Sequence, residues 1–329
     1  MDSLVNQNPT FSIETFGCKV NSYDTGLLQK RLQSRGWSWS KTEPNIHVLN
    51  TCAVTGEATK EALRRIRKIK ARHPEALVVV TGCAAQVDTD QLSNLSAADL
   101  IIANSHKGRL EEIVDRYYKG DRQRVFKSNI FKKEELEAGG GVRLHHTRSF
   151  LKIQDGCDSF CTYCVIPFAR GKSRSLSIKN LVQRVQALYQ QGVREVVLTG
   201  VHIGDYEDVN LKLEDLIETL LKKTFMPRFR LSSLEPVELS DRLLELYQDP
   251  RMCPHFHMSI QSAQTKVLKD IKRNYGAQEV EESLEKIALR LPRAFVGMDV
   301  IVGFPGESEA EFQETHDRLA SLPWTRIHV

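Results

Sequence analysis

The stretch Gly156-Cys157-Asp158-Ser159-Phe160-Cys161-Thr162-Tyr163-Cys164 decides the fold, because it places three cysteines at the spacing C-x3-C-x2-C. A strand is predicted directly before it, at residues 150–154. The cysteines therefore lie at the carboxyl end of a strand, where barrel active sites form. A short loop with three thiolates can hold one metal centre. Zinc would need a fourth protein ligand, whereas an iron–sulfur cubane held by three thiolates keeps one iron open to a small molecule.

The rest of the chain after this loop predicts repeated strand–helix units. Strands are expected at 150–154, 195–199, 229–232, 256–260, 297–302 and 326–329, and amphipathic helices lie between them, for example at 178–191 and 279–290. Sequential βα units with right-handed crossovers curl into a barrel or part of one. We expect a part-barrel over 147–329, truncated in or near its sixth strand, with a C-terminal part missing.

The N-terminal segment predicts a separate α/β domain over residues 9–121. Strands at 11–16, 46–50, 76–81 and 99–103 alternate with helices, which is typical of a parallel sheet covered on both faces. Cys18, Cys52 and Cys83 each follow one of these strands by one or two residues. Because the carboxyl ends of parallel strands lie at one edge of a sheet, the three thiols can converge there. Three ordinary buried thiols are the alternative.

Residues 122–146 interrupt this alternation and predict a linker, since they combine charged runs with Gly139-Gly140-Gly141. The His145-His146 pair is interpreted as a solvated linker feature. Cys253 has no partner at ligand spacing and is interpreted as a buried or incidental thiol.

Composition excludes several classes of protein. The chain has 329 residues, of which 41% are hydrophobic and 27% charged, so wholesale disorder is not expected. Its mean hydropathy is −0.35, and no apolar run is long enough to cross a bilayer. The N-terminus lacks the features of a signal peptide. Seven cysteines without an export signal favour metal ligands, catalytic thiols or buried thiols over disulfides, in a reducing, cytoplasmic compartment.

Together these features resemble the radical S-adenosylmethionine (SAM) methylthiotransferases, over nearly the whole chain. The loop at 156–164 carries the resemblance to the radical SAM superfamily, with Tyr163 preceding its third cysteine. The strings that carry the narrower resemblance lie, in the family's order, at 15–23, 50–55, 81–86, 156–174, 257–262 and 299–307. These enzymes end in a small RNA-binding β-barrel, and the chain stops before that part.

The resemblance implies two [4Fe-4S] clusters. Cys157, Cys161 and Cys164 would hold the cluster that binds SAM. Cys18, Cys52 and Cys83 would hold a second cluster that delivers the transferred sulfur. It also implies tRNA as a partner and a reductant protein of flavodoxin or ferredoxin type, but it does not identify the sulfur donor.

The resemblance also narrows the substrate. Gly17-Cys18-Lys19-Val20-Asn21 and residues 51–55 resemble the subgroup that acts on N6-threonylcarbamoyladenosine beside the tRNA anticodon. The subgroup that acts on isopentenyladenosine tends to carry Gln-Met-Asn after its first cysteine. The subgroup that modifies a ribosomal-protein aspartate tends to carry Pro-Lys-Asn. Two alternatives belong to other classes of protein. One is an electron carrier with two clusters, and the other is a non-catalytic iron–sulfur or RNA-binding fragment.

Further residues are expected around these cofactors. Loops at the barrel rim predict a SAM site that includes Tyr163, Gly200, Gln261 and Gly303. Arg170, just after the cysteine loop, is expected to bind substrate or to act as a structural anchor, and a simple surface salt bridge is the alternative. The helix that carries residues 64–73 has six Lys or Arg and no acid, so its charged face is either simply solvated or contacts phosphates.

Overall fold

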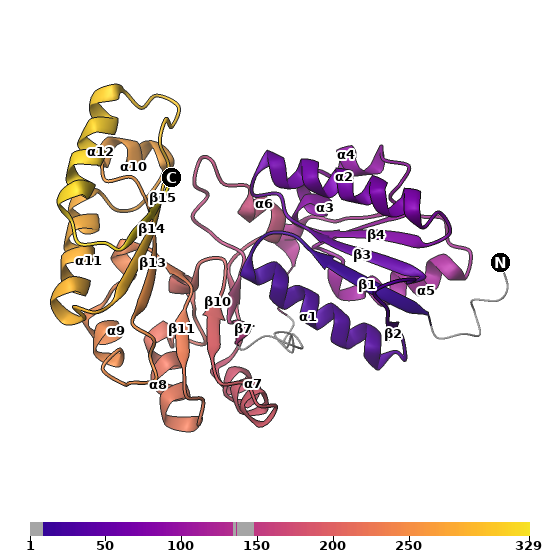
Figure 1. Ribbon diagram of the computed structural model, residues 1–329, viewed down its shortest axis with the longest axis horizontal. Coiled ribbons are helices and arrows are strands. Elements are labelled where there is room, and N and C mark those ends of the chain that lie inside the picture. Colours follow the sequence, from indigo (N-terminus) through magenta and orange to yellow (C-terminus); the bar gives the residue numbers. More distant parts are fainter. Residues whose placement is uncertain (1–8, 134–135, 137–147) are drawn as a thin grey trace. The chain divides into compact units, whose positions relative to one another are not determined.

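The computed structural model describes residues 9–133, 136 and 148–329 (Figure 1). Its contacts divide the chain into two compact units, each of which is described by itself. The first contains the described part of Met1–Leu144 together with Asp155–Asp158 and Val165–Lys172. The second contains the described part of His145–Gln154, Ser159–Cys164 and Ser173–Val329.

The first unit is built on a six-stranded parallel sheet. Its strands follow the order β2 (Ser38–Trp39), β1 (Thr10–Thr15), β3 (Ile46–Thr51), β4 (Leu77–Gly82), β5 (Leu100–Ala103) and β6 (Val125–Phe126). Every residue of β3, β4 and β5 is buried, because helices cover both faces of a parallel α/β sheet. The predicted N-terminal α/β fold is confirmed.

The helices of this unit cover the two faces of the sheet (Figure 1). On one face, α1 (Lys19–Ser34) and α5 (Leu110–Tyr118) pack Leu28, Leu32 and Ile113 against the strands. On the other, α2 (Gly56–Arg72), α3 (Cys83–Val87) and α4 (Thr89–Ser93) do the same through residues such as Ile66 and Ala84. Three short helices complete the unit: η1 (Lys107–Arg109), η2 (Ile130–Lys132) and α6 (Ile166–Arg170).

The segment expected as a linker, 122–146, contains regular structure at its start. Strand β6 adds to the sheet beside β5, because the apolar side chain of Phe126 enters the first unit's core, where it is 6% exposed. Here the structure differs from the expectation, and the sheet extends further along the chain than the sequence suggested. The triple glycine and the His145-His146 pair lie outside the described residues.

The second unit contains two parallel sheets that follow the predicted strand–helix alternation. The first has the order β11 (Phe229–Leu231), β10 (Val196–Thr199), β7 (Ser149–Lys152). The second has the order β12 (Ser233–Leu234), β13 (His255–Gln261), β14 (Phe295–Val300), β15 (Arg326–His328). Strands β11 and β12 follow one another with only Ser232 between them, so the chain passes directly from one sheet to the next. The expected part-barrel is confirmed. The short strands β8 (Gln154–Asp155) and β9 (Arg174–Ser175) pair separately.

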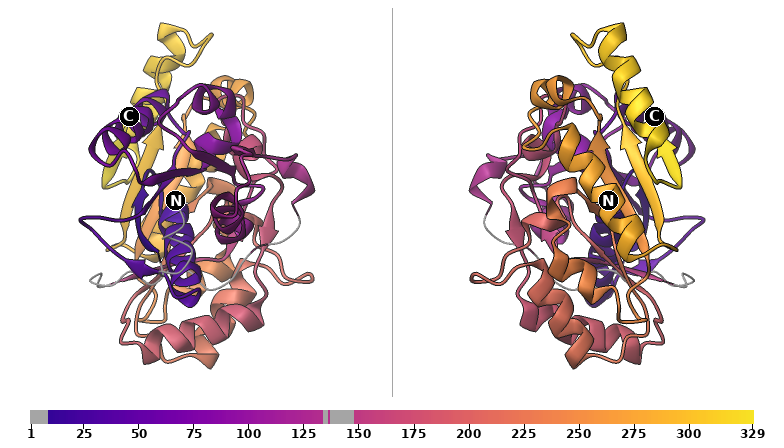
Figure 2. Two further views of the ribbon diagram at one scale, coloured as in Figure 1. Left: turned by 90° about the vertical axis from the view of Figure 1, so that its right-hand side faces the viewer. Right: turned by 90° about the vertical axis from the view of Figure 1, so that its left-hand side faces the viewer.

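Helices alternate with the strands of the second unit (Figures 1 and 2). Ser177 caps one of these helices and Ser308 caps another, each with a side chain that accepts a backbone N–H. None of the helices in the described residues is both long and apolar enough to span a membrane. The helices are α7 (Ile178–Gln190), η3 (Ile203–Asp205), α8 (Leu213–Lys223), η4 (Pro236–Glu238), α9 (Asp241–Leu246), α10 (Thr265–Ile271), α11 (Ala277–Arg290) and α12 (Glu309–Ser321).

Candidate functional site

Cys18, Cys52 and Cys83 lie at one edge of the first unit's sheet, which we call the three-cysteine edge. They follow β1, β3 and β4, which are neighbours in that order. Thr51 and Gly82 are register partners, and Cys52 and Cys83 come directly after them. The strands are parallel, so the cysteines leave the sheet at its carboxyl edge, as the sequence predicted.

Two glycines bring the three cysteine-bearing loops into contact. Gly17 has a φ of +87°, and a Cβ there would lie 2.6 Å from the Cys52 Sγ. Gly82 has a φ of +99°, and a Cβ there would lie 2.3 Å from the Thr51 carbonyl oxygen. Any side chain at either position would push neighbouring loops apart, so glycine is required at both.

The three thiols of this edge share one electrostatic environment with Arg170. Burial raises the pKa of the Cys52 thiol, Cys83 and Cys18 raise it further, and Arg170 lowers it, which places all four groups in one electrostatic neighbourhood. Thiolates are the usual ligands of iron–sulfur clusters, so three of them at one sheet edge form a candidate metal-binding set.

The C-x3-C-x2-C loop is anchored at both of its ends. The Cys157 N–H donates to the Gly171 carbonyl at 3.1 Å. Within the second unit, the Cys164 N–H donates to the Cys161 carbonyl at 2.9 Å. Cys161 is 9% exposed and packs against the apolar residues Val267 and Ile271 of α10. Three thiols within eight residues can serve as the ligands of an iron–sulfur cluster with one open iron.

The four residues predicted around SAM all belong to the second unit. Gly200 follows β10, Gln261 ends β13, and Gly303 comes shortly after β14, so the three lie at carboxyl ends of strands. Tyr163 lies in the cysteine loop, and its hydroxyl accepts from Arg273 at 3.3 Å. Gln261 has a φ of +66° where the β13–β14 register shifts, which marks a local distortion at this rim. Their role as a SAM site stays a prediction.

Polar side chains at the same strand ends were missed by the sequence analysis. The Gln154 side-chain oxygen accepts the N–H groups of Val201 and His202, each at 3.0 Å, which fixes the loop after β10. Gln154 is fully buried two residues after β7, where β8 begins, and a polar residue at the end of an apolar strand is the signal that could have identified it.

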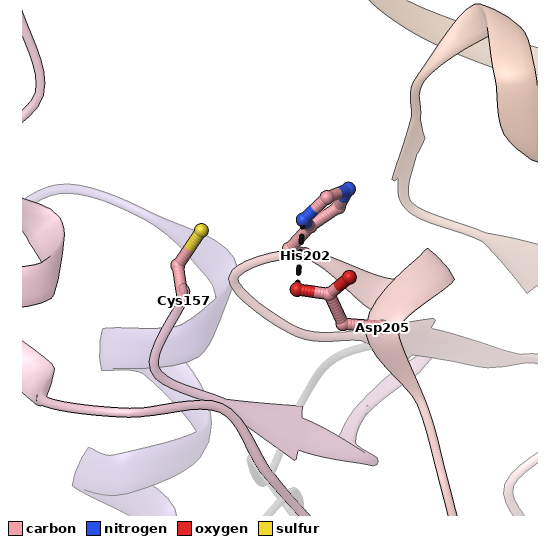
Figure 3. A group of neighbouring side chains, drawn as sticks. All are labelled: Cys157, His202 and Asp205. Atoms are coloured by element: carbon pink, nitrogen blue, oxygen red, sulfur yellow. Dashed lines mark ion pairs between the residues drawn. The ribbon is translucent and has the colours of Figure 1, made fainter. Parts of the chain in front are cut away.

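A second missed group surrounds His202. Its Nδ1 lies 3.0 Å from the Asp205 carboxylate, and this ion pair is drawn as a dashed line in Figure 3. Its Nε2 pairs with Glu238 and lies 3.6 Å from Glu235. Burial raises the pKa of the Glu235 carboxyl, while Arg273 and His202 lower it. His202, Glu235 and Glu238 present ligand atoms within 4.8 Å of one another, but the Arg273 cation already pairs with Glu235.

Arg170 is buried rather than exposed, at 3%. Its guanidinium donates to Asp155 at 2.8 Å and to Asn21 at 2.6 Å, and it pairs with Asp24 at 3.3 Å. Of the two roles expected for it, this placement favours the structural anchor. Cys253 is 5% exposed, so its thiol is buried as expected.

The basic helix is α2, and it is amphipathic as predicted. Ala62, Ile66 and Ile69 are buried toward the sheet. Part of its charge is neutralised, because Arg65 pairs with Glu14 and Arg64 with Glu57. The exposed cations with no such pair among the described residues are Arg67, Lys68 and Arg72.

Comparison with known proteins places these features in a family. Residues 151–319 match the family model of the radical SAM superfamily, and residues 10–103 match the model described as uncharacterized protein family UPF0004. The chain is 38% identical to threonylcarbamoyladenosine tRNA methylthiotransferase MtaB of Aquifex aeolicus, over 97% of this chain and 79% of that protein. It is 34% identical to the protein of the same name from Bacillus subtilis, over 97% of this chain and 72% of that protein. A tRNA-2-methylthio-N(6)-dimethylallyladenosine synthase from Staphylococcus haemolyticus is 31% identical, over 93% of this chain and 62% of that protein.

Solved structures agree on the fold. The radical SAM methyltransferase TsrM from Kitasatospora setae superposes with a TM-score of 0.72 at 13% identity, covering 98% of this chain and 74% of that chain. The cobalamin-dependent radical SAM enzyme OxsB superposes with a TM-score of 0.62 at 13% identity, covering 94% of this chain and 52% of that chain. The matched radical SAM region spans half of the residues, and the relatives extend the match over nearly all of them. The chain therefore belongs to the radical SAM methylthiotransferase family.

Proposed function

We propose that this enzyme converts N6-threonylcarbamoyladenosine next to the tRNA anticodon into its 2-methylthio derivative. The observation that carries the proposal is the 38% identity, over 97% of the chain, with a relative named for that activity. Relatives with that name are 31–38% identical, whereas those named for dimethylallyladenosine are 30–33% identical. Residues 17–21 and 51–55 favour the same substrate.

Membership in the radical SAM superfamily implies a [4Fe-4S] cluster and SAM. When bound, they supply a reductively generated 5′-deoxyadenosyl radical, which can remove hydrogen from a carbon that no side chain could deprotonate. We assign the thiolates of Cys157, Cys161 and Cys164 to that cluster. Tyr163, Gly200, Gln261 and Gly303 are assigned to SAM, since three of them lie where barrel enzymes bind ligands.

The second cysteine set is proposed to hold a second [4Fe-4S] cluster that serves sulfur delivery. The convergence of Cys18, Cys52 and Cys83 at one sheet edge supports this assignment, as do the two glycines that allow close approach. The proposed partners are tRNA, a flavodoxin- or ferredoxin-type reductant and a sulfur donor. We also propose that the enzyme acts in the cytoplasm, where it would meet this tRNA substrate.

Nucleoside mass spectrometry tests the substrate. The purified, anaerobically reconstituted protein is given reductant, SAM and either of two tRNAs, one carrying N6-threonylcarbamoyladenosine and one carrying isopentenyladenosine. We expect a 2-methylthio product only from the first. A product only from the second would overturn the substrate assignment while leaving the enzyme class intact.

Two triple variants test the cysteine assignments. Changing Cys157, Cys161 and Cys164 to Ala should remove about half of the iron and abolish SAM cleavage. Changing Cys18, Cys52 and Cys83 to Ala should preserve cleavage to 5′-deoxyadenosine and abolish methylthiolation. Full methylthiolation by the second variant would refute the role of the three-cysteine edge.

A further inference from the structure

A buried polar network lies against the three-cysteine edge, entirely within the first unit. Its cations are Arg170 and Lys107, and its carboxylates are Asp24 and Asp155. Arg170 pairs with Asp155 at 2.8 Å and with Asp24 at 3.3 Å, and Lys107 pairs with Asp24 at 3.2 Å. All four residues are at most 9% exposed. Buried charges are retained only when paired and hydrogen-bonded, so the network must form as a whole.

The network reaches the backbone beside two of the cysteines through one asparagine. The Asn21 side-chain oxygen accepts from Arg170 at 2.6 Å. Its amide nitrogen donates to the carbonyls of Phe16, at 2.8 Å, and Thr51, at 2.9 Å. Phe16 lies two residues before Cys18, and Thr51 directly precedes Cys52. Arg170 therefore orients the group that ties these two loops together.

The third cysteine, Cys83, is linked through Asn104 to Ala169, the residue of α6 that precedes Arg170. Asn104 donates to the Ala169 carbonyl at 2.9 Å, and the same amide lies 3.8 Å from the Cys83 Sγ. Lys107 adds a further link, since its ammonium donates to the Asn50 side chain at 3.2 Å. Helix α6 thus contacts the loops of all three cysteines through two asparagines.

We propose that Arg170 is a positioning residue that sets the geometry and charge of the three-cysteine edge, and that it does not bind the RNA substrate. The inference rests on the proposed function, because it takes Cys18, Cys52 and Cys83 as cluster ligands. The forked guanidinium is suited to this task, since it reaches three acceptors on α1 and β8 at once. A lysine would keep the charge but could not make all of these bonds.

The test isolates this edge by starting from the variant in which Cys157, Cys161 and Cys164 are Ala. Iron and acid-labile sulfide per chain are then measured after reconstitution. Arg170→Met in this background should lower bound iron at least threefold, and Arg170→Lys should restore part of it. Arg65→Met is the matched control, because Arg65 also pairs with a carboxylate of the first unit but lies outside the network. It should keep the iron of the background variant.

A second readout separates positioning from general loss of structure. Arg170→Lys and Arg170→Gln are compared by circular dichroism and by the midpoint potential of the cluster that remains. Loss of the cation in Arg170→Gln should shift that potential to more negative values, because a reduced cluster carries one more negative charge. Arg170→Lys should stay near the parent.

Three results would overturn the inference. Unchanged iron and potential in Arg170→Gln would show that the edge does not depend on this side chain. Unchanged iron with at least tenfold weaker tRNA binding would show a substrate contact instead. A background variant without iron would refute the second cluster of the proposed function, and the inference would fall with it.

Discussion

Gly82→Ala is the sharpest single perturbation of the three-cysteine edge. Gly82 ends β4 and directly precedes Cys83, with φ +99° and ψ −164°. A Cβ there would lie 2.3 Å from the Thr51 carbonyl oxygen and 2.5 Å from the Thr51 nitrogen. Those atoms belong to the backbone of β3, so no flexible side chain can move aside. Relief requires β3 and β4 to separate where Cys52 and Cys83 begin.

The expected cost has two parts. The backbone conformation of Gly82 is almost restricted to glycine and costs another residue about 1–3 kcal/mol. Overpacking against a rigid neighbour adds about 1–3 kcal/mol. We therefore expect Gly82→Ala to lower the free energy of unfolding by about 4 kcal/mol. Gly120 also has a φ of +99° but nothing within 4 Å of its Cβ position, so Gly120→Ala carries only a conformational cost of about 1 kcal/mol.

Urea unfolding of the reconstituted protein and iron content measure the two variants side by side. Gly82→Ala should lower both stability and iron bound in the background that lacks the three loop cysteines. Gly120→Ala should lower stability slightly and leave iron unchanged. Equal stability losses in the two variants, with full iron in both, would refute the argument that close backbone contact builds this edge.

Three further predictions concern other parts of the chain. Burial and the nearby His73 lower the pKa of His47 from 6.5 to about 4. As the pH falls from 7.5 to 5.5, the unfolded chain therefore gains a proton at this residue while the folded chain does not. Urea titrations should show a loss of about 1.4 kcal/mol in the free energy of unfolding over this range, and His47→Gln should lack that loss. Gly303→Val should weaken SAM binding at least tenfold in equilibrium dialysis. Gly306→Val is the control, because Gly306 also has a positive φ and open space around it, and this variant should bind SAM normally. Equal affinities of the two variants would contradict the SAM assignment. If tRNA phosphates lie along α2, neutralising its three exposed cations should reduce the magnitude of the slope of log K against log salt by about 2–3. These cations are Arg67, Lys68 and Arg72. An unchanged slope would show that this face contacts solvent and not phosphates.

The sequence was sufficient for features that depend on local pattern. Val78, Val79 and Val80 predict a buried strand by themselves, and a cysteine directly after such a strand must lie at the carboxyl edge of a parallel sheet. The convergence of Cys18, Cys52 and Cys83 followed from that rule. The positive φ of Gly17 and Gly82, each directly before one of these cysteines, is known from the structure and not from the sequence pattern.

Features that depend on contacts between distant segments could not be predicted. Arg170 and Asp24 are separated by 146 positions, and nothing near either residue in the sequence identifies the other as its partner. The same holds for Lys107, which gave no signal because a lysine at the start of a helix is ordinarily exposed. Strand β6 was missed because two apolar residues among charged ones do not form a periodic pattern.

The two cysteine sets are built by different means, and this difference explains why we expect mutations to separate them. Cys157, Cys161 and Cys164 lie within eight residues of one loop, so their spacing is largely a local property of the chain. Cys18, Cys52 and Cys83 come from three strands and meet only if the sheet register and the buried network are both intact. A substitution that shifts one strand end, such as Gly82→Ala, therefore alters the second set while the loop keeps its own spacing. Arg170 is the informative exception, because it also pairs with Asp155, two residues before Cys157. Comparing the iron lost from each set in Arg170→Met and Gly82→Ala would show whether the two sets are positioned independently or through this one guanidinium.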